Sequence, residues 1–359
     1  TNNAHIINHG NQEVYGGISN GSVIDTGGHQ EVSGHGSYQG QANNTVINGG
    51  SQTISEGGIS TGTIINDKGT MSVLTNAKAD ATRIDNGGVM DVAGNATNTI
   101  INGGTQNINN YGIATGTNIN SGTQNIKSGG KADTTIISSG SRQVVEKDGT
   151  AIGSNISAGG SLIVYTGGIA HGVNQETGSA LVANTGAGTD IEGYNKLSHF
   201  TITGGRAEHV VLENTGELTV VAKTTAKNTT VDAGGKLIVQ KEAKTDTTRL
   251  NYGGVLEVQD GGEAKHVEQQ SGGALIASTT SGTLIEGTNS YGDAFYIRNS
   301  EAKNVVLENA GSLTVVTGSR AVDTIINANG KMDVYGKDVG TVLNSAGTQT
   351  IYASATSDK

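Results

Sequence analysis

Short stretches of alternating polar and apolar residues recur along the whole chain, separated by turns that contain glycine. Many stretches have the form of Gln52-Thr53-Ile54, with Val or Ile two residues after the first position. A second stretch of the form Thr-x-Ile follows, as in Thr63-Ile64-Ile65. A period of two is the period of a β-strand, in which successive side chains point to opposite faces. The pattern therefore predicts two or three short strands and their turns in every repeat.

The repeats begin about 19 residues apart, and nineteen of them cover the chain. The first position of each repeat is occupied, in order, by Gln12, Gln30, Gln52, Met71, Met90, Gln106, Gln124, Gln143, Leu162, Ala180, Phe200, Leu218, Leu237, Leu256, Leu275, Phe295, Leu313, Met332 and Gln349. A unit of this size cannot bury an apolar face alone, so successive units must stack. We predict an all-β fold, a parallel β-helix (solenoid) of about 19 rungs of about 19 residues. No linker or domain boundary is visible, so residues 1–359 are expected to form a single β-helix domain.

The first position of each repeat should point into the solenoid, because apolar residues occupy it from residue 162 onward. The glutamines at this position then predict an interior ladder of amides, each bonded to the rungs above and below. The residue between the two inward positions, such as Glu13 or Glu31, should point outward. Glycine pairs such as Gly49-Gly50 and Gly87-Gly88 mark tight corners that need a positive φ.

Two segments lengthen the repeat, residues 183–199 and residues 278–294. Each is followed by a phenylalanine, Phe200 or Phe295, which we expect to fill the interior. The sequence Val-Val-Leu-Glu-Asn at residues 210–214 also recurs 95 residues later, at residues 305–309. A longer period therefore lies on the short one, and we expect irregular rungs with protruding polar loops near 183–199 and 278–294.

Composition supports strands and excludes several classes of protein. Isoleucine and valine outnumber leucine 60 to 14, and β-branched side chains favour strands over helices. With 57 Gly but no Pro, the chain cannot be collagen. A net charge of −10 argues against non-specific nucleic-acid binding. No run of 18 apolar residues predicts a transmembrane helix, and the absence of Cys excludes disulfides and thiolate metal sites.

The two halves of the chain differ in their polar residues. Residues 1–180 contain 19 charged residues and 22 Asn, whereas residues 181–359 contain 35 charged residues and 12 Asn. Uncharged polar columns can associate with a like surface without electrostatic repulsion, so the N-terminal half is the better candidate for such a contact.

The repeats resemble the passenger domains of the self-associating autotransporter adhesins, the antigen 43, AIDA and TibA type, and antigen 43 looks closest. The resemblance is carried by units such as Thr45-Val46-Ile47-Asn48-Gly49-Gly50 and residues 99–104, by residues 302–309, and by the irregular rungs before Phe200 and Phe295. It covers essentially the whole chain. The resemblance implies a right-handed β-helix, bent at the irregular rungs. It also implies export through a C-terminal outer-membrane barrel, and we expect that barrel and the signal peptide to lie outside this chain.

The function that the resemblance implies is homotypic self-association on the bacterial cell surface, hence autoaggregation and biofilm formation. The partner would be the passenger of a neighbouring cell, and release as a cleaved passenger is a further expectation. We place the self-association interface on an outward polar strip near the corner before Thr-x-Ile. It comprises Asn43, Asn44, Thr45, Thr61, Asp80, Thr82, Arg83, Thr97, Asn98, Thr99, Thr117 and Asn118. Asn and Thr offer donors and acceptors that a copy of the same surface can satisfy, and Asp80 with Arg83 could add charge-assisted pairs.

An adhesin that binds a host-cell, matrix or glycan partner through a groove or the protruding loops is the alternative. Tyr194, Tyr291 and Tyr296 lie near those loops and could stack on sugar rings, although Tyr296 is better explained as a partly buried strand residue. Self-pairing is favoured by the Asn/Thr strip, whereas clustered exposed aromatic residues would favour a glycan.

Catalysis and metal binding are the readings that we reject. A glycosidase needs two carboxylates about 5–9.5 Å apart. Glu13 and Glu31 could meet on successive rungs, but exposed acids are common on an acidic solenoid. His5, His9, His29 and His35 gather near the N-terminus, where capping or solvent exposure explains them better than zinc. We expect no enzyme, no cofactor and no metal site.

Overall fold

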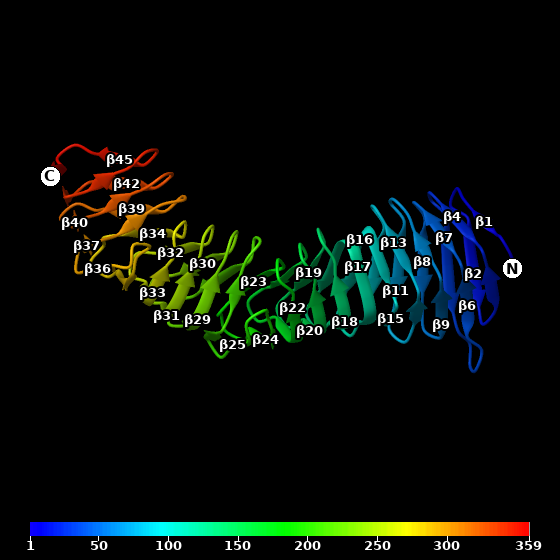
Figure 1. Ribbon diagram of the computed structural model, residues 1–359. Coiled ribbons are helices and arrows are strands. Elements are labelled where there is room, and N and C mark those ends of the chain that lie inside the picture. The colour runs from blue at the N-terminus through cyan, green and yellow to red at the C-terminus, as the bar shows by residue number, and fades with distance from the viewer. Residues whose placement is uncertain (359) are drawn as a thin grey trace. The chain divides into compact units, whose positions relative to one another are not determined.

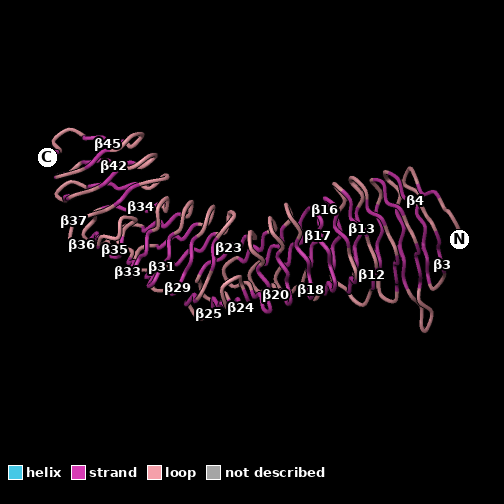
Figure 2. Tube along the Cα trace, viewed as in Figure 1, coloured by secondary structure: helices cyan, strands magenta, loops and turns pink. Residues whose placement is uncertain are grey.

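The computed structural model describes residues 1–358, which form strands joined by turns and contain no helix (Figures 1 and 2). The chain divides into two units, Thr1–Thr177 and Gly178–Lys359. In each unit, strands pair in parallel with strands of the preceding and following rungs. In the first column, for example, Gln12 is the register partner of Gln30, and Gln30 of Gln52. The predicted parallel β-solenoid is confirmed.

Each rung of the first unit passes through three strand columns. The first column contains β2 (Asn11–Tyr15), β5 (His29–Ser33), β8 (Ser51–Ile54), β11 (Thr70–Val73), β14 (Val89–Val92), β19 (Arg142–Val145) and β21 (Ser161–Val164). The second contains β3 (Ile18–Asn20), β6 (Gly40–Asn43), β9 (Gly58–Thr61), β12 (Lys78–Asp80) and β15 (Asn95–Thr97). The third contains β1 (His5–Ile6), β4 (Val23–Asp25), β7 (Val46–Asn48), β10 (Ile64–Ile65) and β13 (Arg83–Asp85). Longer strands join columns, namely β16 (Ile100–Ile108), β17 (Ile113–Ile126), β18 (Lys131–Ile137), β20 (Thr150–Ile156) and β22 (Ile169–Gln175).

Inward residues of all three columns form the core of the first unit. Val32, Ile47 and Ile84 are completely buried, as the period of two predicts. The glycine pairs serve two different purposes at the corners. Gly87 adopts a φ of +78°, which L side chains rarely adopt, whereas a Cβ on Gly88 would lie 2.5 Å from the Ile65 carbonyl oxygen of the preceding rung. Only the first glycine of the pair therefore meets the predicted need for a positive φ.

The second unit is also built of strand columns, with different strand lengths. Its first column contains β23 (Ala180–Asn184), β28 (Glu217–Val220), β30 (Lys236–Val239), β32 (Val255–Val258), β34 (Ala274–Ser278), β39 (Ser312–Val315), β42 (Lys331–Val334) and β45 (Thr348–Ile351). The other columns contain β24 (Asp190–Tyr194), β26 (Arg206–Glu208), β27 (Val211–Leu212), β29 (Thr225–Val231), β31 (Lys244–Leu250), β33 (Glu263–Gln269), β35 (Leu284–Thr288), β37 (Glu301–Lys303), β38 (Val306–Leu307), β40 (Arg320–Val322), β41 (Ile325–Ile326), β43 (Lys337–Val339), β44 (Val342–Leu343) and β46 (Thr356–Asp358).

Two further strands, β25 (His199–Thr203) and β36 (Ala294–Arg298), are inserted antiparallel to their neighbours. β25 lies between β24 and β26, and β36 lies between β35 and β37. In the first column, β23 pairs directly with β28, and β34 pairs directly with β39. The first column therefore contains no strand at the level of β25 or of β36.

This topology corrects two expectations from the sequence. Phe200 and Phe295 are buried, as predicted, but they belong to the inserted strands and not to the first column. The segments 183–199 and 278–294 are not loops throughout, because β24 and β35 lie within them. The chain doubles back on itself at these places, where the turns around residues 195–198 and 289–293 lead into β25 and β36.

The repeated Val-Val-Leu-Glu-Asn sequence bridges the gap that each insertion leaves in the third column. Glu213 accepts a hydrogen bond from the Gly178 amide at 2.9 Å, and Asn214 donates to the Gly178 carbonyl at 2.7 Å. Glu308 and Asn309 make the same pair of bonds to Gly272, both at 2.9 Å. Side chains replace missing strand pairing at these two places, which explains why the motif recurs with the longer period.

Candidate functional site

Four of the twelve predicted interface residues point into the solenoid. Thr45, Thr82, Thr99 and Thr117 are no more than 1% exposed. In the sequence Thr-x-Ile, the threonine lies two residues before an inward isoleucine, so both side chains share one face of the strand. The prediction that these threonines face outward is wrong. The same period of two that predicts the strands places the threonines inward.

The buried threonines belong to an interior polar network. Gln124 donates to the Gln106 side-chain oxygen at 2.8 Å, and Gln143 donates to that of Gln124 at 2.6 Å. Thr117 donates to the same oxygen of Gln106 at 3.4 Å, and Thr135 to that of Gln124 at 3.3 Å. The predicted amide ladder is therefore confirmed, and it includes a column of hydroxyl groups that the sequence analysis missed. Because buried polar groups need partners, this network fixes the register of successive rungs.

The other eight predicted residues lie together on the outside of the first unit, where the second column turns into the third. We call them the corner strip: Asn43, Asn44, Thr61, Asp80, Arg83, Thr97, Asn98 and Asn118. Thr61 is the register partner of both Asn43 and Asp80, and Asp80 is also that of Thr97. Asn98 forms the corner itself with a φ of +55°, a left-handed conformation that Asn tolerates better than most residues.

Part of the corner strip is already hydrogen-bonded within the chain. Asp80 accepts bonds at one carboxylate oxygen from the Thr97 hydroxyl at 2.6 Å and from the Asn98 amide at 2.9 Å. These bonds stabilise the charged form and hold the pKa of Asp80 below its ordinary value of 3.8. Arg83 forms a bidentate pair with Asp85, with distances of 3.0 and 2.9 Å. Asp80 and Arg83 thus have separate partners in the chain.

A second polar ladder runs beside the corner strip, at the end of the third column. Asn48 donates to Asp25 at 3.0 Å, Asn66 to Asn48 at 2.7 Å, and Asn120 to Asn102 at 2.9 Å. The sequence analysis did not include these residues in the interface. The recurrent Ile-Asn dipeptide could have revealed them, because a residue that follows an inward isoleucine points outward.

Aliphatic side chains are interspersed among these polar residues. In the third column, Ile64 is the register partner of Val46 and of Arg83, and Ile100 is that of Arg83 and Asn118. Ile100 is 38% exposed. The outer corner of the first unit is therefore a mixed surface, in which neutral polar groups alternate with small apolar patches.

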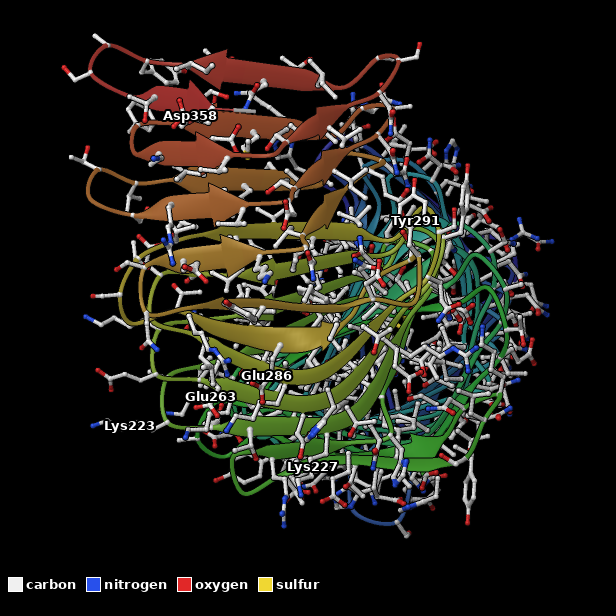
Figure 3. All side chains as sticks on the ribbon, turned by 60° about the vertical axis from the view of Figure 1, so that its left-hand side comes forward. Lys223, Lys227, Glu263, Glu286, Tyr291 and Asp358 are labelled. Atoms are coloured by element: carbon white, nitrogen blue, oxygen red, sulfur yellow. The ribbon has the colours of Figure 1, made fainter. Side chains whose placement is uncertain are left out.

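The same corner of the second unit carries charges of alternating sign. Lys227 is the register partner of Glu208 and Asp246, and Lys265 is the register partner of Asp246. In Figure 3, Lys227, Glu263 and Glu286 lie on the side of the second unit that faces the viewer. Tyr291 lies apart from them, at the upper right of the view. Hydrogen bonding to Glu263 is the largest effect that raises the pKa of Lys265. This corner is a ladder of opposite charges, unlike the corner strip.

Tyrosines near the inserted strands differ in exposure. Tyr194 and Tyr291 are 63% and 58% exposed, and the ring of Tyr194 packs edge-on against His199. Tyr296 is half-buried, donates a hydrogen bond to Glu301 and lies under the Arg298 guanidinium, 4.4 Å from the ring centroid. The interpretation of Tyr296 as a partly buried strand residue is confirmed.

Three of the four histidines weighed for metal binding have ordinary partners. His5 contacts Asp25 at 2.5 Å, His35 contacts the Tyr15 hydroxyl at 2.8 Å, and His29 contacts Ser51 at 2.8 Å. Glu13 and Glu31 are register partners. Within residues 1–358, no group of three or more His, Cys, Asp or Glu side chains is placed to hold a metal ion. The described residues also contain no helix that could cross a membrane.

Comparison with known proteins shows that the chain is similar to bacterial autotransporters. Residues 35–88, 192–254 and 286–347 match the family model described as "Adhesin of bacterial autotransporter system, probable stalk". The chain is 87% identical over 319 residues, 89% of its length, to "Probable autotransporter YpjA" of Escherichia coli (strain K12). It spans only 21% of the length of that relative.

Among the solved structures that the chain matches is a crystallised fragment of TibA, hyper-glycosylated by TibC. The two chains are 22% identical over the whole of this chain and 98% of the fragment, with a TM-score of 0.49.

Proposed function

This chain belongs to the stalk family of bacterial autotransporter adhesins, and we propose that it mediates homotypic self-association between cells. The matched family and relative are described as an adhesin stalk and an autotransporter, not as enzymes. On this proposal the segment is part of a protein exported to the bacterial cell surface. Passengers on neighbouring cells would bind each other, which produces autoaggregation and biofilm formation. Release of the passenger by cleavage is part of the same proposal.

The corner strip is the observation that carries this proposal. Asn44, Thr61 and Asn118 are exposed, and their side chains have no hydrogen-bond partner within residues 1–358. Each offers a group that can donate and a group that can accept, so an identical surface turned around can satisfy it. The strip has little net charge, since Asp80 is offset by Arg83. Single contacts of this kind are weak, but many of them across two cell surfaces give strong avidity.

Substitution of the two corner asparagines tests this proposal. Asn44 and Asn98 have φ values of +54° and +55°, so Asn44→Gly with Asn98→Gly removes the side chains at a backbone conformation that glycine accepts. Each lost hydrogen bond costs about 0.5–1.5 kcal/mol, so we expect self-association to weaken about tenfold. Sedimentation of the purified segment over a concentration series, and clumping of cells that display it, measure the effect.

Asn76→Gly is the matched control for this experiment. Asn76 is also exposed in the first unit, with a φ of +62°, but it lies at a different corner, between the first and second columns. The control should associate like the wild type. Two results together would refute the proposal: a purified wild-type segment that stays monomeric at high concentration, and no clumping of cells that display it. If the control weakens self-association as much as the double variant does, the corner strip is not the interface.

Binding to a host-cell, matrix or glycan partner is the second candidate function. Exposed Tyr194 and Tyr291 at the turns of the inserted strands favour it, because an exposed aromatic ring can pack against a sugar ring. This candidate involves the second unit, whereas self-association involves the corner strip of the first. The two functions can therefore be tested separately.

A further inference from the structure

The outer surface of the second unit is hollowed between the two inserted strands. Three hollows of about 360, 360 and 460 Å³ adjoin one another, since Glu268 lines all of them. Their floor follows one column of register partners, in the order Thr230, Arg249, Glu268 and Thr288. We call this feature the inter-strand groove. It belongs entirely to the second unit.

Each end of the inter-strand groove lies at one insertion. Leu197 and Ser198, from the turn before β25, line the hollow at one end. Tyr296 and Arg298, from β36, line the hollow at the other end. The groove is therefore a product of the irregular rungs, because regular rungs would present a continuous flat strand surface at this position.

Side chains on the groove floor are available for a ligand. Thr230, Glu268 and Thr288 make no side-chain hydrogen bond or ion pair within residues 1–358, and Arg249 uses only Nε, to Asn251 at 3.3 Å. Neighbouring positions outside the floor are paired. Their contacts include Lys244 with Glu263 at 2.9 Å and His266 with Asp246 at 2.6 Å. Unpaired donors and acceptors thus concentrate on the floor and not over the whole face.

Charges in the inter-strand groove balance. Arg249 and Arg298 supply two positive charges, and Glu268 and Glu286 supply two negative charges. A strongly anionic or cationic polymer would meet repulsion from one of these pairs. Hydroxyl groups suit the mixture best, because a hydroxyl both donates to a carboxylate and accepts from a guanidinium or threonine.

We propose that the inter-strand groove binds a neutral, extended oligosaccharide that runs along the stacked rungs. Each rung advances by about 4.8 Å, so the floor spans roughly 14 Å and presents polar groups at a spacing suited to successive pyranose units. The Leu197 side chain and the exposed edge of Tyr296 contact the apolar faces of the sugars at the two ends. This inference rests on the second candidate function and is independent of self-association.

Fluorescein-labelled cello-oligosaccharides of increasing length are the probes that test this proposal, with fluorescence anisotropy as the measurement. We expect saturable binding whose affinity rises with length and levels off at about four sugar units, when the floor is filled. Chitosan and oligogalacturonate fragments of the same length, which carry positive and negative charge, should bind at least about tenfold more weakly.

Variants of the floor and wall locate the site. Arg249→Gln and Glu268→Gln should each lower the affinity about tenfold or more, because each removes a charged hydrogen-bond partner. The double substitution Tyr296→Thr and Arg298→Thr should do the same. Thr201 and Thr203 occupy the matching positions of β25, so an inserted strand accepts both residues. Glu242→Gln, at an exposed glutamate outside the groove, is the matched control and should bind like the wild type.

The outcomes separate this proposal from self-association. Cello-oligosaccharide binding that survives Asn44→Gly with Asn98→Gly but is lost in Arg249→Gln and Glu268→Gln supports the groove, with circular dichroism showing that the variants fold. Absence of saturable binding, or equal binding by the variants, overturns it. Preference for a charged probe overturns the neutral class. A third outcome also overturns the proposal. If the wild type binds no sugar and the floor variants no longer sediment as oligomers, the groove contacts a second copy of the chain.

Discussion

Interiors of the two units solve the same packing problem with different chemistry. In the first unit, buried glutamines at positions such as 30, 52, 106, 124 and 143 bond to one another and to buried threonines. In the second unit, the corresponding column is aliphatic, with Leu218, Leu237 and Leu256 in register. Both columns consist of strands in parallel register, so this difference lies in the inward side chains.

Because of this difference, the interior of the first unit fixes the register of its strands more strictly than the interior of the second unit does. An amide ladder is directional, because each oxygen must meet a donor of the next rung. Leucine contacts are not directional, so the strands of the second unit can change register without losing them. Leu275 of β34 stacks on Leu256 of one neighbour, whereas Ala277, two residues further, stacks on Leu313 of the other. This two-residue change of register occurs where β36 is inserted.

Exteriors differ in the same sense. The corner strip of the first unit is mostly neutral, whereas the second unit has ion pairs such as Lys236 with Glu257 at 2.6 Å. Exposed pairs of this kind contribute little to stability, but they leave fewer unpaired groups for a partner. Unpaired polar groups thus lie along the corner strip in the first unit and on the floor of the inter-strand groove in the second.

Exchanging the two interior chemistries should have the largest effect. Leu237→Gln places an amide between Leu218 and Leu256, neither of which can bond to it. Loss of apolar burial together with an amide that neither neighbouring rung satisfies should cost about 4 kcal/mol or more. Hydrogen exchange of the β28, β30 and β32 amides measures this locally, which suits a solenoid that need not unfold in one step. Leu237→Met, with its volume nearly conserved, should cost less than about 1.5 kcal/mol. Similar protection in the two variants would contradict the comparison.

The reverse exchange should be less costly but should spread further. Gln124→Leu removes the acceptor of Gln143 and of Thr135, and the donor to Gln106. Leucine adds apolar burial, so the net cost should be about 2–3 kcal/mol, mainly from the unsatisfied partners. Loss of amide protection on both neighbouring rungs, in β16 and β19, is the expected pattern. Destabilisation confined to β17 would show that the ladder does not couple the rungs.

Sequence reasoning was most reliable for features that repeat. The period of two and the Gln column predicted the strands, the parallel stacking and the interior amide ladder, because each rests on the same local rule applied many times. The same rule places Thr82 and Thr99 inside with the isoleucines that follow them. Their prediction as outward residues failed because hydroxyl groups were assigned to the surface by polarity, before the strand face was considered.

The inserted strands could not be derived from local patterns. Phe200 and Phe295 fit the first-column pattern of an apolar residue followed two positions later by isoleucine, and a strand pattern does not specify its direction. Direction is set by the turns around residues 195–198 and by contacts far along the chain, such as Glu213 with Gly178. The inter-strand groove depends on these contacts, which is why the sequence indicated only an unspecified groove.

A charged contact beside the first inserted strand distinguishes it from the second. Lys196 bonds to Glu213 at 2.7 Å and to Asp232 at 2.6 Å. Burial would lower the pKa of Lys196, but these two hydrogen bonds outweigh it and raise the pKa. Lys196→Met leaves the buried Glu213 without its cation and should cost about 1–2 kcal/mol at neutral pH. Stability from a raised lysine pKa is complete below its ordinary value of 10.5 and is lost as pH rises through the folded value.

Thermal unfolding of wild type and Lys196→Met between pH 7 and pH 12 measures this contribution, and the difference should shrink at the alkaline end. Tyr291→Phe is the matched variant at the second inserted strand. Within residues 1–358 the Tyr291 hydroxyl bonds only to Asn327, at 3.2 Å or more, and Glu308 keeps its bond from Asn327 at 3.1 Å. It should therefore have a smaller effect. An equal loss in both variants would mean that the lysine contact does not distinguish the two insertions.

Titration of Asp80 should produce the smallest effect and shows how little of the first unit's stability resides on its surface. Hydrogen bonds from Thr97 and Asn98 lower the pKa of Asp80, so its contribution is present above the ordinary value of 3.8 and is lost as pH falls through the lower folded value. Asp80→Asn keeps an acceptor for Thr97 and Asn98, so stability at pH 7 should change by well under about 1 kcal/mol. The two proteins should become indistinguishable below the folded pKa, as judged by thermal unfolding between pH 2 and pH 7. A large loss at pH 7 would place Asp80 in the framework of the solenoid, and the corner strip would no longer be a surface that is free to bind a partner.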